Sequence, residues 1–555
     1  MEYVVTLVPI YGWLRGNMSE KLPKSPLVSK SSEGLLSLTD EGREALTPLV
    51  TSTEDQVYTF TDSASTIMVA AAMARLSRNP NDLRTIMADE FLSLDDDEKD
   101  EALLRRVVTD FGDDSVMQLD NLQVVFEGVS NLATKAIERG RFAAYLEQST
   151  RYLRFDRRDE NGNYRYHTPE ELDFDTKELF EEGIDQIFDI YSELYVKVRE
   201  HIENTSSTPE EERGAAWKNA CHAQACDSIR GLLPAATKAT VGVAGSTQAI
   251  YNMILHLESE PLQEHKKLGR SALAAVRQVA PVFFERIDMP ERGGLISDNK
   301  ESTRANSKDL AVNLVEKYGG IEQTEGTYVK LLAAYGSEDE LIAKILADRS
   351  AYAYEDMVEL VGSLSASEKE DVISTYVGER YNRRVKPGRA FELPHYAFEI
   401  VCDFGAFRDI QRHRAMDGVE WQELQPYLGH TTPKVITDAG VEDEFERAFA
   451  VGQNLYETLK ERGYDEQAQY ATLFGHNMRF NFVINARSLT HSAELRTTPQ
   501  GHPSYRKVYQ EMASEVEKVH PTIVKVMSFL NQGEDEELAR LGAELAKQRR
   551  LESNS

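Results

Sequence analysis

Two segments of the chain alternate between apolar and polar side chains with the period of a β-strand. The first covers residues 122–127 and the second covers residues 395–404. Apolar residues occupy every second position, namely Leu122, Val124 and Phe126 in the first segment and Tyr396, Phe398, Ile400, Cys402 and Phe404 in the second. A period of two predicts strands that bury one face against a core.

Helical patterns surround each of these strands. An acidic helix that runs into paired arginines is expected before each strand, over residues 95–108 and 363–386. A long helical stretch is expected later in each half, over residues 237–279 and 480–519. The same succession therefore occurs twice, which predicts an internal duplication with a period near half the chain.

An arginine pair follows each predicted strand and gives the repeat a measurable spacing. The pairs are Arg139-Gly140-Arg141 and Arg412-His413-Arg414, and 273 residues separate Arg139 from Arg412. Matching positions in the late helices, Leu257 and Arg496, are 239 residues apart. The first copy thus carries extra residues, and the polar segment 157–168 is expected to be part of that insertion.

The polar, Ser- and Asn-containing segment 298–308 is a candidate boundary between the two copies. We therefore expect two domains, residues 1–300 and residues 309–555.

Composition limits the classes of partner. The chain has 555 residues, 41% of them apolar, and a formal net charge of −30. This charge disfavours non-specific binding to nucleic acid or to an anionic membrane, but clustered arginines can still bind a small phosphorylated ligand. No apolar run approaches the ~18 residues of a membrane span, and the first residues lack the pattern of a secretory leader. We expect a soluble, cytoplasmic protein.

Three cysteines, Cys221, Cys226 and Cys402, are too few for a disulfide framework. Cys221, His222 and Cys226 have one possible metal-binding spacing, but no second pair of ligands matches it. We interpret them as ordinary helix residues and expect no metal site.

The arginine pairs belong to longer motifs. The first half reads RGRFAAYLEQSTRY, with seven residues between Arg141 and Ser149, and the second half reads RHRAMDGVEWQEL. Later in the second half comes NARSLTHSAELRTTPQGHPSYR, where the first half has STQAIYNMILHLESEPLQEHKK. The chain resembles flavin-dependent thymidylate synthases, which carry Arg-His-Arg, seven residues and Ser-x-Arg-Tyr, and later a helix of the form Asn-x-Arg-Ser ending in Leu-Arg.

The two halves depart from the family pattern in complementary ways. The first keeps Ser149 and Arg151, and also Arg230 before Leu-Leu-Pro, but has Gly140, Ser246 and Leu257 at other family positions. The second keeps Arg412, His413, Arg414, Asn485, Arg487 and Arg496, but has Gln422, Leu424 and Gln469. In this family the nucleotide site lies between subunits. The resemblance thus implies that a fused pair builds one complete site from opposite halves and leaves its mirror site inactive.

The resemblance implies an α+β fold in two copies, each a twisted sheet with helices, arranged as a pseudo-dimer. It implies reductive methylation of dUMP to dTMP, with FAD as cofactor and methylenetetrahydrofolate and NADPH as co-substrates. A homodimer of tandem chains would reproduce the four domains of the family's assembly.

The resemblance also implies roles for individual residues, with Arg496 as the catalytic residue. The expected dUMP-binding residues are Glu147, Ser149, Arg151, Arg230, Asp409 and Arg412. The expected FAD-binding residues are Arg412, His413, Arg414, Asn485, Arg487 and His491.

The chemistry of these residue types agrees with the implied roles. Guanidinium groups and a hydroxyl suit a phosphate dianion, and a permanent cation at Arg496 suits the negative charge that develops on uracil. On one continuous helix, Arg487 and Arg496 would lie on opposite faces and serve different sites.

Other interpretations stay open at this stage. Arginine pairs form surface ion pairs, Ser149 could cap a helix, and Asn485 could cap the helix that follows it. Asp409 and Gln500 replace residues that face uracil and flavin in the family. They leave open a related pyrimidine-nucleotide methyl- or hydroxymethyltransferase, or a non-catalytic nucleotide- or flavin-binding scaffold.

Overall fold

The computed structural model describes residues 26–32, 35–76, 79–92, 114–319, 325–534 and 537–553. These residues form two compact units, one of residues 1–121 with 280–283 and the other of residues 122–279 with 284–555. The acidic helix expected over residues 95–108 lies outside the described residues.

The smaller unit has a two-stranded antiparallel sheet and short helices around a small apolar core. Its described elements are β1 (Val28–Lys30), β2 (Leu36–Leu38), α1 (Asp40–Leu46), α2 (Thr66–Arg75), α3 (Leu83–Ile86), the π-helical turn Met87–Phe91 and the 3-10 turn Asp114–Gln118. The core includes Leu46, Ile86, Met87 and Phe91, all at most 3% exposed.

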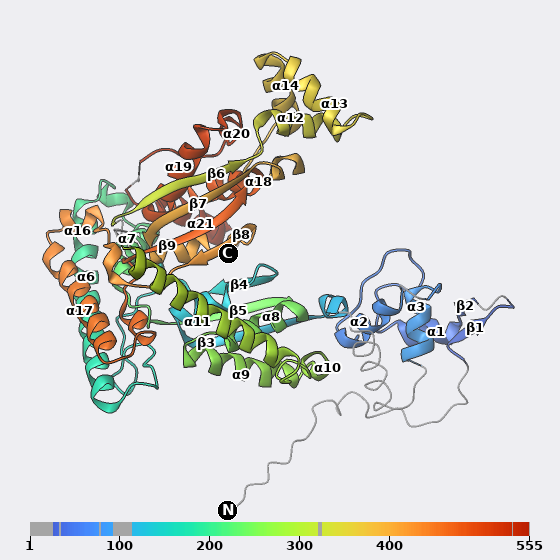
Figure 1. Cartoon of the computed structure of the whole chain (residues 1–555), viewed down its shortest axis with the longest axis horizontal. Helices are drawn as coiled ribbons and strands as arrows, with labels where there is room; N and C mark the ends of the chain where they lie inside the picture. Colours follow the sequence, from blue (N-terminus) through green and yellow to red (C-terminus); the bar gives the residue numbers. More distant parts are fainter. Residues whose placement is uncertain are drawn as a thin grey trace, which may run out of the picture. The chain divides into compact units, whose positions relative to one another are not determined.

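The larger unit contains two sheets, each accompanied by helices (Figure 1). The first has the order β3-β5-β4 and the second has the order β6-β7-β9-β8. The strands are β3 (Asn121–Ser130), β4 (Ala143–Glu147), β5 (Lys238–Ser246), β6 (Tyr328–Tyr335), β7 (His395–Asp403), β8 (Met416–Trp421) and β9 (Asn477–Asn485).

Helices of the first copy are α5 (Asn131–Ile137), α6 (Phe174–Thr205), α7 (Ala215–Ile229), α8 (Thr247–Glu258), α9 (Gln263–Arg277) and α11 (Gly293–Tyr318). The short helix α10 (Pro281–Phe284) has its first three residues in the smaller unit. Helices of the second part are α12 (Glu338–Ala347), α13 (Tyr354–Ser363), α14 (Ala366–Val377), α15 (Phe404–Ile410), α16 (Lys434–Asp438), α17 (Glu442–Glu461), α18 (Ala486–Arg496), α19 (Pro503–Glu517), α20 (Pro521–Lys525) and α21 (Leu541–Ser553). Short 3-10 turns at Glu210–Glu212, Arg230–Leu232, Arg389–Glu392, Pro426–Leu428 and Gln467–Ala471 connect them.

Both separations expected from the sequence recur in the starting residues of these elements. Helices α5 and α15 begin at Asn131 and Phe404, which are 273 residues apart. Helices α8 and α18 begin at Thr247 and Ala486, which are 239 residues apart. The strand order β3-β5-β4 matches β7-β9-β8, so the second sheet equals the first with β6 added at its edge.

The predicted strands are present, but the predicted late helices start too early. Strand β3 buries Leu122, Val124 and Phe126, and β7 follows the predicted alternation as far as Asp403, after which Phe404 begins α15. The prediction of helix at the start of residues 237–279 and 480–519 is wrong, because β5 and β9 occupy these positions. Their buried residues alternate with period two, as in Ala239, Val241 and Val243, and the helical period begins only after the strand.

Three further expectations change in detail. The acidic helix expected over residues 363–386 is shorter, because α14 ends at Val377 and Gly378 follows in a left-handed conformation (φ 64°). The expected boundary at residues 298–308 lies inside α11, which is one continuous helix of 26 residues. Segment 157–168 has no helix, but much of the extra length of the first copy is helical: α6 has 32 residues against 20 in α17, and α7 has no counterpart in the described second copy.

In both copies a hydroxyl–carboxylate hydrogen bond holds the start of the first helix. The capping residue supplies the carboxylate in the second copy and the hydroxyl in the first. Asp403 caps α15 by accepting from the Ala406 amide (2.8 Å), and Ser504 of α19 donates to the same carboxylate. In the first copy, Ser130 caps α5 and donates to Glu264 of α9 (2.6 Å). A buried hydroxyl–carboxylate pair thus joins the capping residue to the late helix in both copies.

A short antiparallel contact joins the two copies. Pro234 forms a bridge with Leu473, and hydrogen bonds flank it on both sides. The Ala235 amide donates to Thr472 (2.7 Å) and the Phe474 amide donates to Leu233 (2.8 Å). Next to this junction α6 packs on α17, where a Cβ atom added at Gly183 would lie 3.1 Å from the Leu455 side chain. The two copies therefore share one apolar core.

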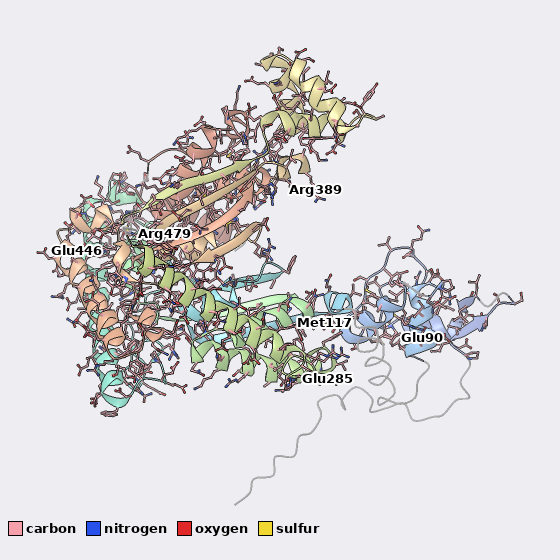
Figure 2. The ribbon with its side chains drawn as sticks, in the orientation of Figure 1. Glu90, Met117, Glu285, Arg389, Glu446 and Arg479 are labelled. Carbon is pink, nitrogen blue, oxygen red and sulfur yellow. The ribbon has the colours of Figure 1, made fainter. Side chains whose placement is uncertain are left out.

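Side chains fill the space between sheets and helices (Figure 2). Arg479 of β9, labelled there, donates to the Tyr328 hydroxyl of the edge strand β6 (3.2 Å). Of the helices that the structure describes, none is both long enough and apolar enough to cross a membrane.

Candidate functional site

Asp409 lies at the meeting point of the two copies and binds arginines from both. Arg230, in the turn after α7, donates Nη1 to Oδ2 of Asp409 (3.3 Å). Arg496, the last residue of α18, donates to Oδ1 (3.4 Å) and to the backbone oxygen of Asp409 (2.5 Å). Burial alone would raise the pKa of Asp409, but the guanidinium groups of Arg230 and Arg496 hold it well below its usual range. Three of the residues expected from the sequence are thus brought together.

Arg230 is the least satisfied of these arginines. Its side chain is 3% exposed, yet Nε and Nη2 have no hydrogen-bond partner among the residues that the structure describes. Gly405 leaves the space that this guanidinium uses, since an added Cβ would lie 3.3 Å from Nε and Nη2. Buried donors are normally paired, so these two N–H groups are available to an anionic ligand.

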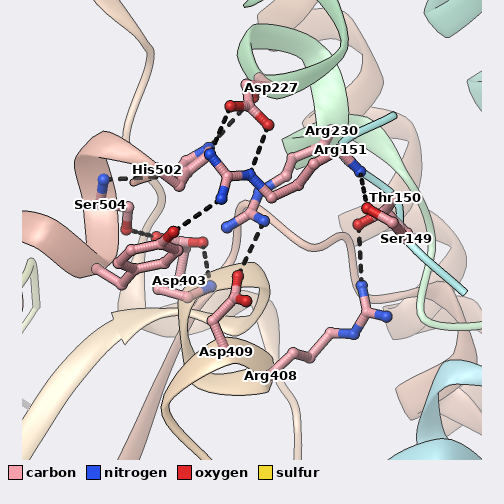
Figure 3. Close-up of polar contacts among 12 residues, drawn as sticks. Ser149, Thr150, Arg151, Asp227, Arg230, Asp403, Arg408, Asp409, His502 and Ser504 are labelled. Carbon is pink, nitrogen blue, oxygen red and sulfur yellow. Dashed lines mark hydrogen bonds and ion pairs between the residues drawn. The ribbon is translucent and has the colours of Figure 1, made fainter. Parts of the chain in front are cut away.

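Arg151 is held more fully by the protein itself (Figure 3). Nε and Nη2 form a two-pronged ion pair with Asp227 of α7 (2.8 Å each), and Nη1 donates to the Tyr505 hydroxyl (2.7 Å). The Gln500 carbonyl accepts a further bond from Nη2 (3.1 Å). The ring of Tyr505 faces the guanidinium groups of both Arg151 and Arg496, at 5.5 and 5.2 Å. Residues of both copies therefore hold Arg151, which the resemblance assigns to phosphate binding, in its position.

Ser149 contacts the backbone of its own turn, whereas Glu147 binds three cationic side chains. Ser149 Oγ accepts from the Arg151 amide (3.2 Å), which shapes the turn rather than the start of a helix. Glu147 is buried and binds Arg408, Arg412 (2.7 Å) and Lys135 (3.5 Å). Burial would raise the pKa of Glu147, but these three cations lower it well below its usual range.

The Arg-His-Arg segment faces the first copy. Arg412 pairs with Glu147 and keeps 36% of its side chain exposed, and Arg414 donates to the backbone oxygen of Ala143. His413 accepts from Arg496 Nε (2.7 Å). Burial and the nearby Arg496 lower the pKa of His413 well below its usual range, so the imidazole is neutral.

The opposite face of α18 carries the remaining expected residues. Asn485 caps the helix by accepting from the Ser488 amide (2.8 Å). Arg487 donates to the Pro387 carbonyl (2.8 Å) and pairs with Glu392, while His491 has a buried Nδ1 without a partner in the described chain. Burial first, then Lys386, Arg383 and Arg487, lower the pKa of His491. Arg487 and Arg496 therefore have different partners, and the expectation that they serve different sites stays a prediction.

The equivalent residues of the first copy form surface contacts. Arg139 pairs with Glu420 (2.5 Å) and stacks on Trp421 (4.9 Å), and Arg141 pairs with Asp417. The counterpart of Arg496 is Leu257, which is fully buried, and the counterpart of Arg230 is Gln469, which accepts from the Leu424 amide (3.2 Å). At this mirror position the counterparts of Arg230 and Arg496 are uncharged, although Arg139, Lys300 and Arg304 act together on His256, the residue before Leu257.

A cavity of about 770 Å³ opens beside Arg230. Its walls come from the first copy, the ends of β6 and β7, the start of α19 and the C-terminal segment. Residues of interest in its lining are Asp227, Arg230, Asp403, His502, Ser504 and Arg540. Among the residues expected from the sequence, Arg230 is the one that lines it.

The cysteines lie in ordinary surroundings. Cys221 and Cys226 lie in α7, as expected, and burial raises the pKa of their thiols to about 11 and about 12. High thiol pKa values argue against an activated cysteine nucleophile. In the part of the chain that the structure describes, no cluster of three His, Cys, Asp or Glu residues is placed to hold a metal ion.

Several residues of the cluster were not expected from the sequence. Arg408 lies four residues before Arg412 and Asp227 three residues before Arg230, so helical spacing from a known motif would have indicated both. Tyr505, Asp403 and Arg540 carry no comparable signal, because they reach the site only through the packing of α19 and of the C-terminal segment.

A family model and several known proteins match this chain. The family model for thymidylate synthase complementing protein matches two regions, residues 56–282 and 330–522, one in each expected half. A UPF0159 protein of Chlamydia muridarum is 31% identical over 525 residues, covering 91% of this chain and 97% of the relative. A flavin-dependent thymidylate synthase of Clostridium tetani is 26% identical over 220 residues, covering 39% of this chain and 80% of the relative. A crystal structure of the UMP/dUMP methylase PolB from Streptomyces cacaoi aligns with 19% identity and a TM-score of 0.29, covering 38% of this chain and 97% of that one.

Proposed function

Because the chain belongs to the thymidylate synthase complementing protein family, we propose that it is a flavin-dependent thymidylate synthase. The reaction is the reductive methylation of dUMP to dTMP. Methylenetetrahydrofolate supplies the carbon, and NADPH supplies the hydride through FAD.

One observation carries this proposal: Arg230 from the first copy and Arg496 from the second bind opposite oxygens of Asp409 within a single chain. The resemblance assigns these arginines to the phosphate and the uracil of one nucleotide. Their convergence supports one complete site made of both copies. The arrangement of Leu257, Gln469, Arg139 and Arg141 supports an inactive mirror position.

The junction at Pro234 and Leu473 supports a pseudo-dimer of halves 1–300 and 309–555. These two residues are themselves 239 positions apart, so each is the counterpart of the other. The flanking bonds from Ala235 and Phe474 are equivalent under the same shift. Such reciprocal contacts are typical of a twofold interface. We further propose that two chains associate into a homodimer with four family domains.

The roles of the site residues follow from their charges. Arg230 offers a phosphate two buried N–H groups that have no partner in the described part of the chain, and Arg151 is held by its ion pair with Asp227. Arg496 places a permanent cation where the uracil ring becomes anionic when N3 loses its proton. Neutral His413 fixes the Arg496 guanidinium by accepting from Nε (2.7 Å). Asp409 and Glu147 hold the arginines in place until the nucleotide competes for them.

The residues on the outer face of α18 and in the Arg-His-Arg segment fit a flavin dinucleotide. Arg412 and Arg414 are exposed, Arg487 is partly exposed, and His491 has a buried nitrogen with no partner among the described residues. Cationic and donor groups of this kind match a diphosphate. FAD, when bound, would carry the hydride and the one-carbon transfer. The protein's own part is to orient the nucleotide and to stabilise its charge.

Purified full-length protein incubated with dUMP, methylenetetrahydrofolate, NADPH and FAD tests the proposal by the mass of the nucleotide product. We expect dTMP and a yellow protein with flavin absorbance. A colourless protein that takes up no added FAD would indicate a non-catalytic scaffold and reject the proposal.

A second candidate rests on Asp409, which is shorter than the Gln or Glu of the family and is fully engaged by arginines. This difference favours a related pyrimidine nucleotide or a hydroxymethylated product. The same mass measurement, repeated with UMP, separates the two.

A further inference from the structure

Residues 537–541 of the C-terminal segment lie against α7, outside the region that the family model matches. Glu537 accepts from the amide (2.8 Å) and the hydroxyl (2.7 Å) of Ser207. The Leu538 amide donates to Gln224 (3.1 Å), and Leu538 is 5% exposed. Leu538 holds a left-handed backbone (φ 46°), which is unfavourable for a side chain of this size and requires compensation by its contacts. The segment is therefore docked at a defined position.

This docking inserts Arg540 beside the ion pair of Arg151. Arg540 is 7% exposed, donates Nη2 to Oδ2 of Asp227 and Nη1 to the Arg151 carbonyl (3.4 Å), and lies over the ring of Tyr152 (4.6 Å). Asp227 is thus one carboxylate shared by two guanidinium groups. The trio of Arg151, Arg540 and Asp227 thus combines two positive charges with one negative charge.

Arg540, Arg230 and Asp227 all line the 770 Å³ cavity. Arg230 contributes Nε and Nη2 donors that have no partner among the described residues, and Arg540 contributes a second guanidinium group, which pairs with Asp227. A cavity of this volume is large enough for a nucleotide. Two guanidinium groups that line one cavity can bind a phosphate by charge and by forked hydrogen bonds.

We propose that Arg540 is a ligand-binding residue that, together with Arg230, forms an anion-binding wall for the phosphate of a nucleoside monophosphate in this cavity. The choice of dUMP as that nucleotide rests on the proposed function. The C-terminal segment is then part of the binding site rather than a surface appendage.

A purely structural role for Arg540 makes a different prediction. If Arg540 only held Asp227 and α7 in place, its loss would lower the melting temperature and weaken every ligand equally. A phosphate-binding role affects only ligands that carry a phosphate. The comparison of dUMP with deoxyuridine therefore distinguishes the two roles.

The experiment uses the full chain with Arg540→Gln and, as control, Arg549→Gln, an exposed arginine on α21, the helix that begins directly after Arg540. Calorimetry measures the binding of dUMP and of deoxyuridine. We expect Arg540→Gln to weaken dUMP binding about tenfold or more, the range of one charged hydrogen bond, and to leave deoxyuridine binding unchanged. Equal losses for both ligands, or unchanged dUMP binding, would overturn the proposal.

A second variant and a second ligand cover the cases in which Arg540→Gln does not fold or the wild type binds no dUMP. If Arg540→Gln does not fold, Arg540→Lys retains the charge opposite Asp227 but loses the fork, and we expect a several-fold loss for dUMP alone; wild-type affinity would overturn the proposal. If the wild-type protein binds no dUMP, the proposed function fails, and inorganic phosphate then tests the wall. We expect phosphate to raise the melting temperature of the wild type and of Arg549→Gln but not of Arg540→Gln, and no shift in the wild type would contradict the inference.

Discussion

Pro234 forms an antiparallel bridge with Leu473, the residue that lies 239 positions further along the chain. The same shift relates β5 to β9 and α8 to α18. A residue that pairs with its own counterpart lies close to a local twofold axis, which supports the proposed pseudo-dimer. The junction also brings Arg230, four residues before Pro234, within reach of the second copy.

The junction should be sensitive to small changes in volume. A Cβ added at Gly475 would lie 2.6 Å from the ring of Phe449 and 3.1 Å from the Gly231 carbonyl, whereas a Cβ at Gly231 would meet nothing closer than 3.5 Å. We expect Gly475→Ala to lower the free energy of unfolding by about 1–3 kcal/mol, as overpacking does, and Gly231→Ala to change it much less. Urea denaturation measures both variants. Equal stability of the two would mean that the space around Gly475 is less tightly filled than the structure shows.

Asp409 should matter for stability as well as for binding. Replacing it with Asn leaves Arg230 and Arg496 without their shared carboxylate in a buried position. We expect a loss of about 3 kcal/mol or more in the free energy of unfolding, as for other broken buried ion pairs. Asp417→Asn, which removes the exposed partner of Arg141, is the matched control and should cost less than about 1 kcal/mol. A negligible effect of Asp409→Asn would show that the arginines find other partners.

Asp403 predicts a distinct pH dependence. Burial raises its pKa from 3.8 to about 6, despite the opposing effect of Arg230. Between these pH values the folded state keeps a proton that the unfolded state releases, so this group lowers stability as the pH rises from about 4 to about 6. We expect Asp403→Asn to gain stability over the wild type, about 3 kcal/mol at pH 7 for a pKa shift of about two units, and nearly none at pH 4. Parallel stability curves for the two proteins over this range would contradict the assignment.

Turnover should distinguish the two copies. We expect Arg496→Ala to lower kcat/KM for dUMP at least about 100-fold, the loss typical of removing one group that stabilises a developing anion. Arg151→Ala should also abolish turnover, because its guanidinium group sits at the same site. Arg139→Ala should have little effect, since Arg139 contacts Glu420 and Trp421 instead. Equal loss in Arg139→Ala and normal turnover in Arg496→Ala would reverse the assignment of active and inactive positions.

The sequence predicted the strands and the spacing of the copies because both depend on local periodicity. Leu122, Val124 and Phe126 alternate clearly, and the 273-residue spacing of the arginine pairs matches the starts of α5 and α15. The error at β5 and β9 arose where a strand passes directly into a helix, so two periods share one apolar run. The Ser246 and Asn485 caps mark the change of period.

From the sequence, site residues could be predicted only where they belong to a family motif. Arg230, Asp409 and Arg496 meet as the family spacing indicated, but the sequence gives no sign that Asp227 would take both prongs of Arg151. Such partners depend on how α7 packs against the second copy. The position of Arg540 is even harder to predict from the sequence, because it depends on a segment that leaves one copy and docks on the other.

The most direct test of a single site built within one chain is to co-express chains carrying Arg230→Ala with chains carrying Arg496→Ala and to measure dTMP formation. Arg230 and Arg496 of the same chain share Asp409, so every site in the mixture should lack one arginine, and turnover should stay at the level of the single variants. If each site instead took its arginines from two chains, mixed dimers would restore about a quarter of the wild-type turnover. Recovery of that size would contradict the account.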